Sequence, residues 1–345
     1  MDSFTNDLNR RLFLKGSAAA AGAALVASIP FSEADAAAHA GKFPTKNIKI
    51  YVPTREGGGA DRLNRAVTSV WKKKLGVNFE ATFFPGAAGR VGYEKFMGLA
   101  KDDGHELLFG NMGPEVLNWV VKKPTFDLSE FQYMAQLDAD PGCIFVSRRS
   151  PFKTIQDVIA AGKKKTLQVG VSRLAHPATL GAMAIARHTG AKLNAIPLSG
   201  GKNTYAGVAT GEMDLGALPS AGVISRSKTF KILVMMSHKN PLPGRTENAP
   251  TMNKALGMNM PELIAGARAY GIKTSMKTTH PANFKKLDET LKEVISDPAF
   301  IKAYIKTKSP IEYVGYRDAA AAAQYAKEIT RIGQDFKELL SGKKS

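Results

Sequence analysis

The stretch NIKIYVPTREGGGADRLNR, residues 47–65, contains an apolar run rich in β-branched and aromatic residues, then a proline, three consecutive glycines and a helical pattern. This order predicts a strand, a loop and a helix that begins near Asp61. Glycines in such a loop allow positive φ and let other atoms approach the main chain, and the helix behind them presents unpaired N–H groups. We therefore expect the loop to bind an anion; a tight turn without a ligand is the alternative.

The first forty residues have the three-part pattern of an export signal, which is removed from the mature protein. The twin arginines Arg10 and Arg11 precede an apolar stretch over residues 18–29, and small residues follow. This pattern favours export to the periplasm by the twin-arginine route, with cleavage between Ala36 and Ala40. The apolar stretch is too short to span about 30 Å of hydrocarbon, so a membrane anchor is the less favoured interpretation.

The chain is strongly basic, with 48 Lys and Arg against 30 Asp and Glu and a formal net charge of +18. The lysines are dispersed over predicted helix faces, and no basic run is interleaved with aromatic residues as in a nucleic-acid groove. Export also argues against a nucleic-acid partner. The charge is interpreted mainly as solvated surface, with steering of an anionic solute as the alternative. The single cysteine, Cys143, cannot form an internal disulfide and is expected to be structural.

Strand-like runs alternate with helical patterns for most of the chain, which is typical of parallel α/β layers. We expect strands at 47–52, 77–84, 105–111, 166–171, 193–198, 213–219 and 231–236, and helices from about 61 and at 92–100, 154–162, 175–189 and 204–210. Extended passages at 131–147 and 263–273 separate the α/β blocks. Two blocks joined by two such passages predict two lobes with a double crossover.

The end of the chain is expected to be helical, at 281–297, 298–307 and 318–340. In the last segment Tyr325, Ile329, Ile332, Phe336 and Leu339 recur at spacings of four, three, four and three residues. This spacing places them on one apolar face, so the helix should pack on a core. We expect these helices to return to the first lobe.

Five short motifs resemble one known family, the periplasmic receptors of tripartite tricarboxylate transporters, also called Bug-type or TctC proteins. In chain order they are VPTREGGGAD (52–61), FFPGAAGRVG (83–92), AKDDGHELLFGN (100–111), IPLSGG (196–201) and ATGEMDLG (209–216). Each motif alone is weak, but their common order and spacing make the resemblance strong. It extends from about residue 43 to residue 340.

The resemblance implies a type II periplasmic binding protein fold, with two α/β lobes, a hinge and a central cleft that closes on a ligand. Residues 41–138 and 262–345 would form lobe one, and residues 139–261 lobe two. The ligand of such receptors usually carries a carboxylate, held by main-chain N–H groups of the first two loops. The implied partner is the membrane part of a tripartite transporter; a sensor is the alternative. The receptor is expected to be a monomer without cofactor or metal.

The expected ligand-binding residues come from four loops. They are Thr54, Arg55, Glu56, Gly57, Gly58, Gly59, Asp61, Gly86, Ala87, Ala88, Gly89, Ser172, Arg173, Leu198, Ser199 and Gly200. For the glycine loops and for Arg173, a role in turn geometry or at the surface is the alternative, and Asp61 is favoured as a helix cap.

Several of these positions depart from the family pattern. Arg55 and Glu56 stand where the family loop is typically apolar; they could pair at the rim, or Arg55 could bind a second carboxylate bidentately. Leu198 and Ser199 replace the usual tyrosine and lysine, which implies a different ligand. Arg268, in the second extended passage, is a further cleft candidate.

An exported enzyme is the rival class, and the motifs do not favour it. LSGGKN, residues 198–203, lacks the first glycine of a phosphate-binding loop, and GVSRL, residues 170–174, lacks the second glycine of a nucleophile elbow. The six histidines include no HExxH, and one cysteine cannot supply a structural zinc set. We therefore expect a binding protein.

Overall fold

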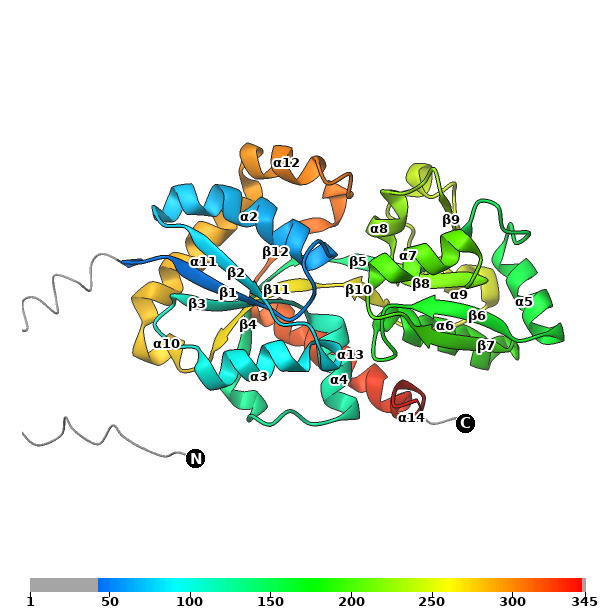
Figure 1. The fold of residues 1–345 in the computed structure, drawn as a ribbon, viewed down its shortest axis with the longest axis horizontal. Helices are drawn as coiled ribbons and strands as arrows, with labels where there is room; N and C mark the ends of the chain where they lie inside the picture. Colours follow the sequence, from blue (N-terminus) through cyan, green and yellow to red (C-terminus); the bar gives the residue numbers. More distant parts are fainter. Residues whose placement is uncertain (1–42, 343–345) are drawn as a thin grey trace, which may run out of the picture. The chain divides into compact units, whose positions relative to one another are not determined.

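Two six-stranded sheets form the framework of the described part of the chain (Figure 1). The computed structural model describes residues 43–342. The predicted export signal, residues 1–40, lies outside the described residues. Within residues 43–342, no helix combines the length and the apolar character needed to cross a bilayer.

The first sheet has a parallel part and an antiparallel part. Across the sheet, the strands are β12 (Val314–Arg317), β4 (Phe131–Asp138), β11 (Arg268–Lys273), β3 (Glu106–Asn111), β1 (Ile48–Val52) and β2 (Phe79–Phe83). Strand β1 is parallel to β2 and β3, and β11 is antiparallel to β3 and β4. The apolar run of the opening motif is therefore an inner strand, which explains why Ile48, Ile50 and Val52 are fully buried.

Helices cover both faces of this sheet. They are α2 (Gly59–Leu75), α3 (Arg90–Leu99), α4 (Met112–Val121), α10 (Met276–Thr279), α11 (Pro281–Ser296), α12 (Pro298–Ile305), α13 (Ala319–Asp335) and α14 (Lys337–Leu340). Figure 1 shows α2, α11 and α12 on one side and α3, α4 and α13 on the other. Helix α2 begins two residues before the predicted start, at the third glycine of the loop.

The second sheet is built in the same way from a shorter part of the chain. Its path is β10 (Ile264–Gly266), β5 (Asp140–Ser147), β8 (Leu215–Pro219), β6 (Leu167–Val171) and β7 (Leu193–Pro197), and β9 (Phe230–Met235) also pairs with β5. The helices α5 (Ile155–Lys164), α6 (Pro177–Thr189), α7 (Gly201–Thr210), α8 (Ser220–Ile224) and α9 (Met252–Leu256) accompany it. Strand β6 is parallel to β7 and β8, as expected for successive βαβ units.

The chain crosses between the sheets at two places. Strand β4 ends at Asp138 and β5 begins at Asp140, while β10 ends at Gly266 and β11 begins at Arg268. Asn111, at the end of β3, holds the second crossing: its Nδ2 donates to Ala265 O at 3.0 Å and its Oδ1 accepts from Ala267 N at 2.8 Å. This double crossover between two α/β lobes is the arrangement that the two extended passages predict.

Several features of the first lobe differ from the sequence prediction. Strand β12 and the short helix α10 lie where the sequence predicts only the longer helical segments. Helix α4 was not predicted, because Gly113 and Pro114 directly follow its first residue, Met112. Both lie in the first turn, where the N–H group that proline lacks would have no partner within the helix. The predicted helix 318–340 is two helices, because the chain leaves helical geometry at Phe336. The apolar face holds nevertheless, since Ile329 and Ile332 are buried and α13 packs on α4 and β4.

Gly92 controls how closely α3 approaches the opening loop. A Cβ atom at this position would lie 2.6 Å from both Cα and Cβ of Pro53. Gly98, on the same helix, is exposed and has nothing within 4 Å of the equivalent point. The two glycines therefore form a matched pair for substitution.

We predict that Gly92→Ala lowers the free energy of unfolding by about 1 to 3 kcal/mol, because the helix must move away from Pro53. Gly98→Ala should be neutral or stabilising by up to about 1 kcal/mol, because alanine is the better helix former. Urea unfolding of both variants measures this difference. Equal effects of the two substitutions would show that the contact with Pro53 is not a constraint.

Candidate ligand-binding cleft

A cleft of about 980 Å³ opens between the two lobes. Its walls come from the loops that follow β1, β2, β6 and β7, from the start of α8 and from α12. Parallel strands deliver their carboxyl ends to the same edge of a sheet, so these loops meet where the lobes face each other. The volume is in the range of small-molecule sites.

The first glycine loop is held in shape by Asp61. Its Oδ2 accepts from Gly57 N at 2.8 Å, and its Oδ1 accepts from Arg65 Nε at 2.7 Å. Asp61 is buried and does not line the cleft. Gly58, the N-cap of α2, offers no side-chain oxygen to the first N–H groups of that helix. The start of α2 therefore lines the cleft without a side-chain cap, which suits an anion.

Gly59 is required by a close contact with another side chain and not by the geometry of a turn. A Cβ atom here would lie 2.7 Å from Nη2 of Arg268. The missing side chain therefore makes room for the guanidinium group of Arg268 beside the start of α2. The third glycine of the motif is thus required for the close approach of Arg268, and its own φ is not positive.

The second glycine loop has four successive residues with positive φ: Gly86 (137°), Ala87 (42°), Ala88 (57°) and Gly89 (105°). For the two alanines this geometry is unfavourable and persists only where neighbours hold it. Asn118 Nδ2 donates to Ala87 O at 3.0 Å, and Arg173 Nη1 donates to Ala88 O at 2.6 Å. Both carbonyl groups are thus held by side chains, while the amides of Ala87 and Ala88 have no acceptor among the described residues.

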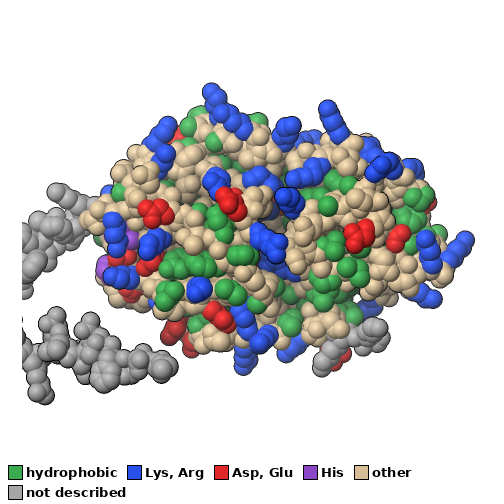
Figure 2. All heavy atoms as spheres, viewed as in Figure 1, with side chains coloured by type: hydrophobic (Ala, Val, Ile, Leu, Met, Phe, Trp, Pro, Cys, Tyr) green, Lys and Arg blue, Asp and Glu red, His purple; other side chains and the backbone are tan. Residues whose placement is uncertain are grey.

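The lining is strongly cationic. Figure 2 shows Lys and Arg side chains over the whole visible face and also at its middle. The charged lining residues are Arg55, Arg62, Arg173, Lys202, Arg226, Arg268 and Glu56. Glu56 accepts from Arg65 Nη2 at 2.6 Å, so its charge is already compensated.

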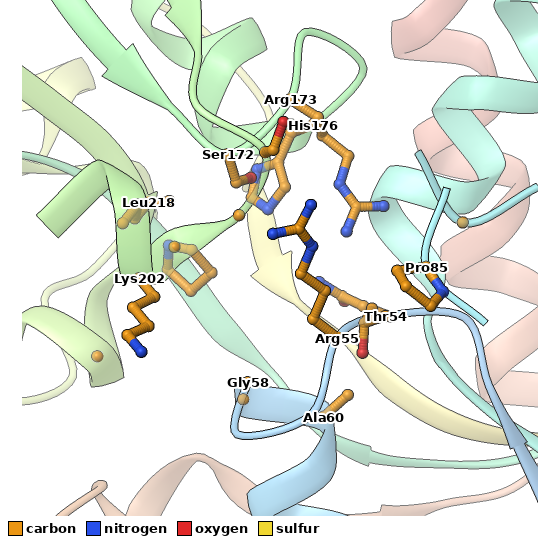
Figure 3. Close-up of a pocket in the computed structure, with 18 of the residues that line it drawn as sticks. Thr54, Arg55, Gly58, Ala60, Pro85, Ser172, Arg173, His176, Lys202 and Leu218 are labelled. Carbon is orange, nitrogen blue, oxygen red and sulfur yellow. The ribbon is translucent and has the colours of Figure 1, made fainter. Parts of the chain in front are cut away.

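Arg55 lies in the cleft and does not pair with Glu56, whose partner is Arg65. In Figure 3 its side chain extends from the first loop into the space between the lobes, towards Ser172 and His176. Among the described residues, no carboxylate lies within 4.0 Å of its guanidinium nitrogens. Of the two alternatives that the sequence left open, the structure places Arg55 in the cleft.

A buried ion pair lies at the floor of the cleft, between the last residue of β4 and the first residue of β11. Arg268 Nη1 pairs with Asp138 Oδ2, and Arg268 N donates to Asp138 Oδ1 at 2.6 Å. Burial raises the pKa of Asp140 to about 7, although the charge of Arg268 opposes this change. Burial lowers the pKa of Arg268, but the two carboxylates outweigh it and raise that pKa overall. Arg268 therefore stays charged.

Arg173 connects the two lobes. It follows β6, yet its Nη1 reaches Ala88 O and lies 3.5 Å from Oε1 of Glu115 on α4. Glu115 is 1 % exposed, and neither of its carboxylate oxygens has a hydrogen-bond partner among the described residues. Burial raises the pKa of Glu115 to about 7, with the charge of Arg173 acting in the opposite direction.

Neutral polar groups complete the lining beside Arg173. His176 is the N-cap of α6, and its Nδ1 accepts from Ala178 N at 3.1 Å. Burial is the main cause that lowers the pKa of His176 to about 3, and the positive charges of Arg173 and Arg268 lower it further. The histidine is therefore neutral at physiological pH. The hydroxyl groups of Thr54 and Ser172 are buried and have no partner among the described residues. Both residues line the cleft.

Most of the residues predicted for the site line this one cleft, and two do not. Those in the lining are Thr54, Arg55, Glu56, Gly57, Gly58, Gly59, Gly86, Ala87, Ala88, Gly89, Ser172, Arg173, Ser199 and Gly200. Asp61 stabilises the first loop from behind. Leu198 Cδ1 lies 3.4 Å and 3.2 Å from where Cβ atoms on Gly170 and Gly207 would stand, so its side chain packs inside the lobe.

Sequence reasoning missed several lining residues. They include Arg62, Asn111, Lys202, Tyr205, Arg226, Tyr304 and Ser309. A signal existed for Arg62, which lies in the first turn of the helix behind the glycine loop. None existed for Tyr304, because only the folded chain brings α12 onto α2 and to the edge of the cleft.

Two α/β lobes, two crossing strands and a cleft of loops between them define a solute-binding protein of the type II periplasmic fold. A profile described as "Tripartite tricarboxylate transporter family receptor" matches residues 63–338, and the chain belongs to this family. A UPF0065 protein of Bordetella pertussis is 25% identical over 287 residues, which cover 80% of this chain and 85% of that protein.

Solved structures have the same fold. A TctC solute-binding protein from Polaromonas is 22% identical and covers 87% of this chain and 99% of its own, with a TM-score of 0.63. MatC from Rhodopseudomonas palustris, with bound malate, is 18% identical and covers 86% and 100%, with a TM-score of 0.71. At these identities the likeness concerns the fold.

We predict that Glu115→Gln changes the pH dependence of stability. The raised pKa of Glu115 contributes stability that is fully present below its ordinary value of 4.5 and is lost as the pH rises through about 7. Glutamine does not ionise, so the variant does not lose this stability. The free energy of unfolding of the variant minus that of the native protein should therefore increase by about 1 to 3 kcal/mol from acid to mildly alkaline pH.

Chemical unfolding across this pH range measures the difference. Glu289→Gln is the control, because Glu289 is an exposed glutamate on α11; its difference from the native protein should stay constant with pH. A constant difference for Glu115→Gln as well would mean that Glu115 is ionised in the folded protein throughout the range.

Proposed function

We propose that this protein is a periplasmic receptor that binds a small organic acid through a carboxylate in the cleft and delivers it to the membrane components of a tripartite transporter. One observation carries the proposal: two glycine loops, both following parallel strands, meet at one cationic cleft. Backbone N–H groups at such loops bind a carboxylate by charge-assisted hydrogen bonds. The proposed contacts are the lining residues of these loops together with Ser172, Ser199 and Gly200.

Family membership supports the same class of ligand and partner. The malate found in MatC is a small acid with two carboxylates, and that protein has the same fold. Export by the twin-arginine route, a periplasmic location and a monomeric state belong to this proposal. A sensor in place of a transporter is the alternative partner, and both would use the same cleft.

The proposed mechanism is closure of the lobes around the acid. Open and closed states coexist, and a ligand stabilises the closed state because it contacts both lobes at once. The two crossings at residues 138–140 and 266–268 are the segments about which the lobes would rotate. No covalent step is required, so no nucleophile or general base is assigned; an exported enzyme that binds an anion is the rival class.

Arg55 is proposed to bind a carboxylate bidentately. It stands in the loop next to the uncapped start of α2, and no described carboxylate neutralises it. A planar guanidinium fork matches the two oxygens of a carboxylate, which a lysine would not. The proposal explains why this family member carries a charge in a loop that is typically apolar.

The first test is a thermal-shift screen with mono-, di- and tricarboxylates. A ligand that binds only the folded protein raises its melting temperature by mass action. We predict an increase for at least one carboxylate and none for the matching amide, since the amide lacks the negative charge. Stabilisation by neutral sugars alone would contradict the proposal.

The second test is Arg55→Ala. Its affinity for dicarboxylates should fall roughly tenfold or more, because a bidentate contact to the second carboxylate is lost. Its affinity for monocarboxylates should change less. Arg331→Ala, an exposed arginine on α13, is the control and should bind as the native protein does. Calorimetric titration measures both affinities, and an equal loss for both ligand classes would count against the assignment.

A further inference from the structure

We infer that the cleft contains a second anion subsite, formed by the guanidinium groups of Arg62, Arg226 and Arg268 with the ring of Tyr205. It would take the oxyanion group at the end of the ligand that lies away from the second glycine loop, which is the same second carboxylate that Arg55 is proposed to contact. This inference rests on the proposed function for the identity of the whole ligand, but the subsite itself can be tested without an organic acid.

The three arginines come from three separate elements and line one cavity. Arg62 lies in the first turn of α2, Arg268 begins β11 beside Gly59, and Arg226 follows α8 in the other lobe. Burial lowers the pKa of Arg62, and the next largest causes are the neighbouring charges of Arg268 and Arg226. The positive charges of Arg268 and Arg226 therefore both act on Arg62, which shares the cleft lining with them.

Each guanidinium is positioned by the protein and keeps donors for a ligand. Arg62 Nη1 donates to Gly57 O at 3.1 Å, and Arg226 Nη1 donates to Gly222 O at 2.9 Å. The guanidinium carbon of Arg226 also lies 4.4 Å from the ring centre of Tyr205. A guanidinium has five N–H donors, and the hydrogen bonds between described residues occupy only Nη1 of Arg62 and of Arg226.

Only some of the arginines in the cleft are neutralised by a carboxylate. Arg268 has Asp138, and Arg173 at the other side of the cleft has Glu115. Arg62 and Arg226 have no carboxylate within 4.0 Å among the described residues, although both are half-buried in the lining. Two half-buried cations on opposite lobes therefore repel each other until an anion lies between them. A multiply charged ligand would remove this repulsion and favour closure of the lobes.

The chemistry of the three guanidinium groups favours an oxyanion. Planar guanidinium groups bind carboxylate, phosphate and sulfonate oxygens by parallel hydrogen bonds. All three head groups share this chemistry, so the subsite requires a negative charge at this end of the ligand and leaves the kind of head group to be measured. The preferred ligand is thus an acid with anionic groups at both ends.

The first experiment probes the subsite alone. Inorganic sulfate and phosphate are added to the native protein and to Arg62→Gln, Arg226→Gln and the control Arg331→Gln, and melting temperatures are recorded. We expect the anions to stabilise the native protein and the control, and to stabilise the two cleft variants clearly less. An equal shift in all four proteins would overturn the subsite.

The second experiment uses matched pairs of ligands, from butyrate and succinate up to octanoate and suberate, in calorimetric titrations. The native protein should bind the best dicarboxylate roughly tenfold or more tightly than its monocarboxylate partner. Arg62→Gln and Arg226→Gln should lose most of this advantage, and Arg331→Gln should keep it. Replacing one carboxylate by a phosphonate or sulfonate in the best ligand then identifies the preferred head group.

The outcomes separate the two proposals. If no organic acid binds but sulfate protection depends on Arg62 and Arg226, the receptor assignment fails and the subsite stands. If dicarboxylates bind and both variants keep the full advantage, the subsite fails and the receptor assignment stands. Arg62→Lys guards against a folding defect: it keeps the charge and should retain part of the advantage, whereas a complete loss would mean that the position acts only through structure.

Discussion

The buried pair of Arg268 and Asp138 is the interaction on which the two-lobed structure depends most. Asp138 ends the strand that leaves the first sheet, and Arg268 begins the strand that returns to it. The pair therefore joins the two crossings, which are also adjacent where Gly266 pairs with Asp140. Removing one partner of such a pair leaves an unpaired charge in the interior, at a cost of about 3 to 5 kcal/mol.

The same pair also shapes the cleft. The guanidinium of Arg268 lies against Gly59, so the first glycine loop, the floor of the cleft and both crossings are packed on one another. Asp140, the next acid along the chain, accepts from Ser220 Oγ at 3.0 Å and Ala221 N at 2.9 Å. The start of α8, which leads to Arg226, is therefore attached to the same group of charges.

The sequence predicted the alternation of strands and helices and the two glycine loops because both depend on local signals. An apolar run before glycines and a helical period is recognisable within about twenty residues. Helix α4 was missed because Gly113 and Pro114 are helix-breaking in most positions but not in a first turn. The break at Phe336 was missed because the apolar spacing continues through it.

The cationic end of the cleft was less predictable, for a physical reason. Arg226 and Tyr304 are brought to the cleft by tertiary packing, and nothing in their neighbouring residues distinguishes them from surface positions. Arg268 was a candidate, but its partner Asp138 is 130 residues away in the chain. Arg173 looked like a ligand contact, whereas the structure also gives it Ala88 and Glu115 on the opposite lobe. Such pairings exist only in the folded chain.

The left-handed geometry at Ala87 and Ala88 has a consequence for how the protein can change. Each strained residue costs about 1 to 3 kcal/mol, and glycine at either position would relieve the strain. Alanine restricts the backbone of this loop more than glycine would, so a ligand that binds there would cause a smaller loss of conformational entropy. Substitutions that relax this loop and raise the melting temperature are therefore expected to weaken ligand selectivity. At these two positions glycine would favour stability and alanine would favour selectivity.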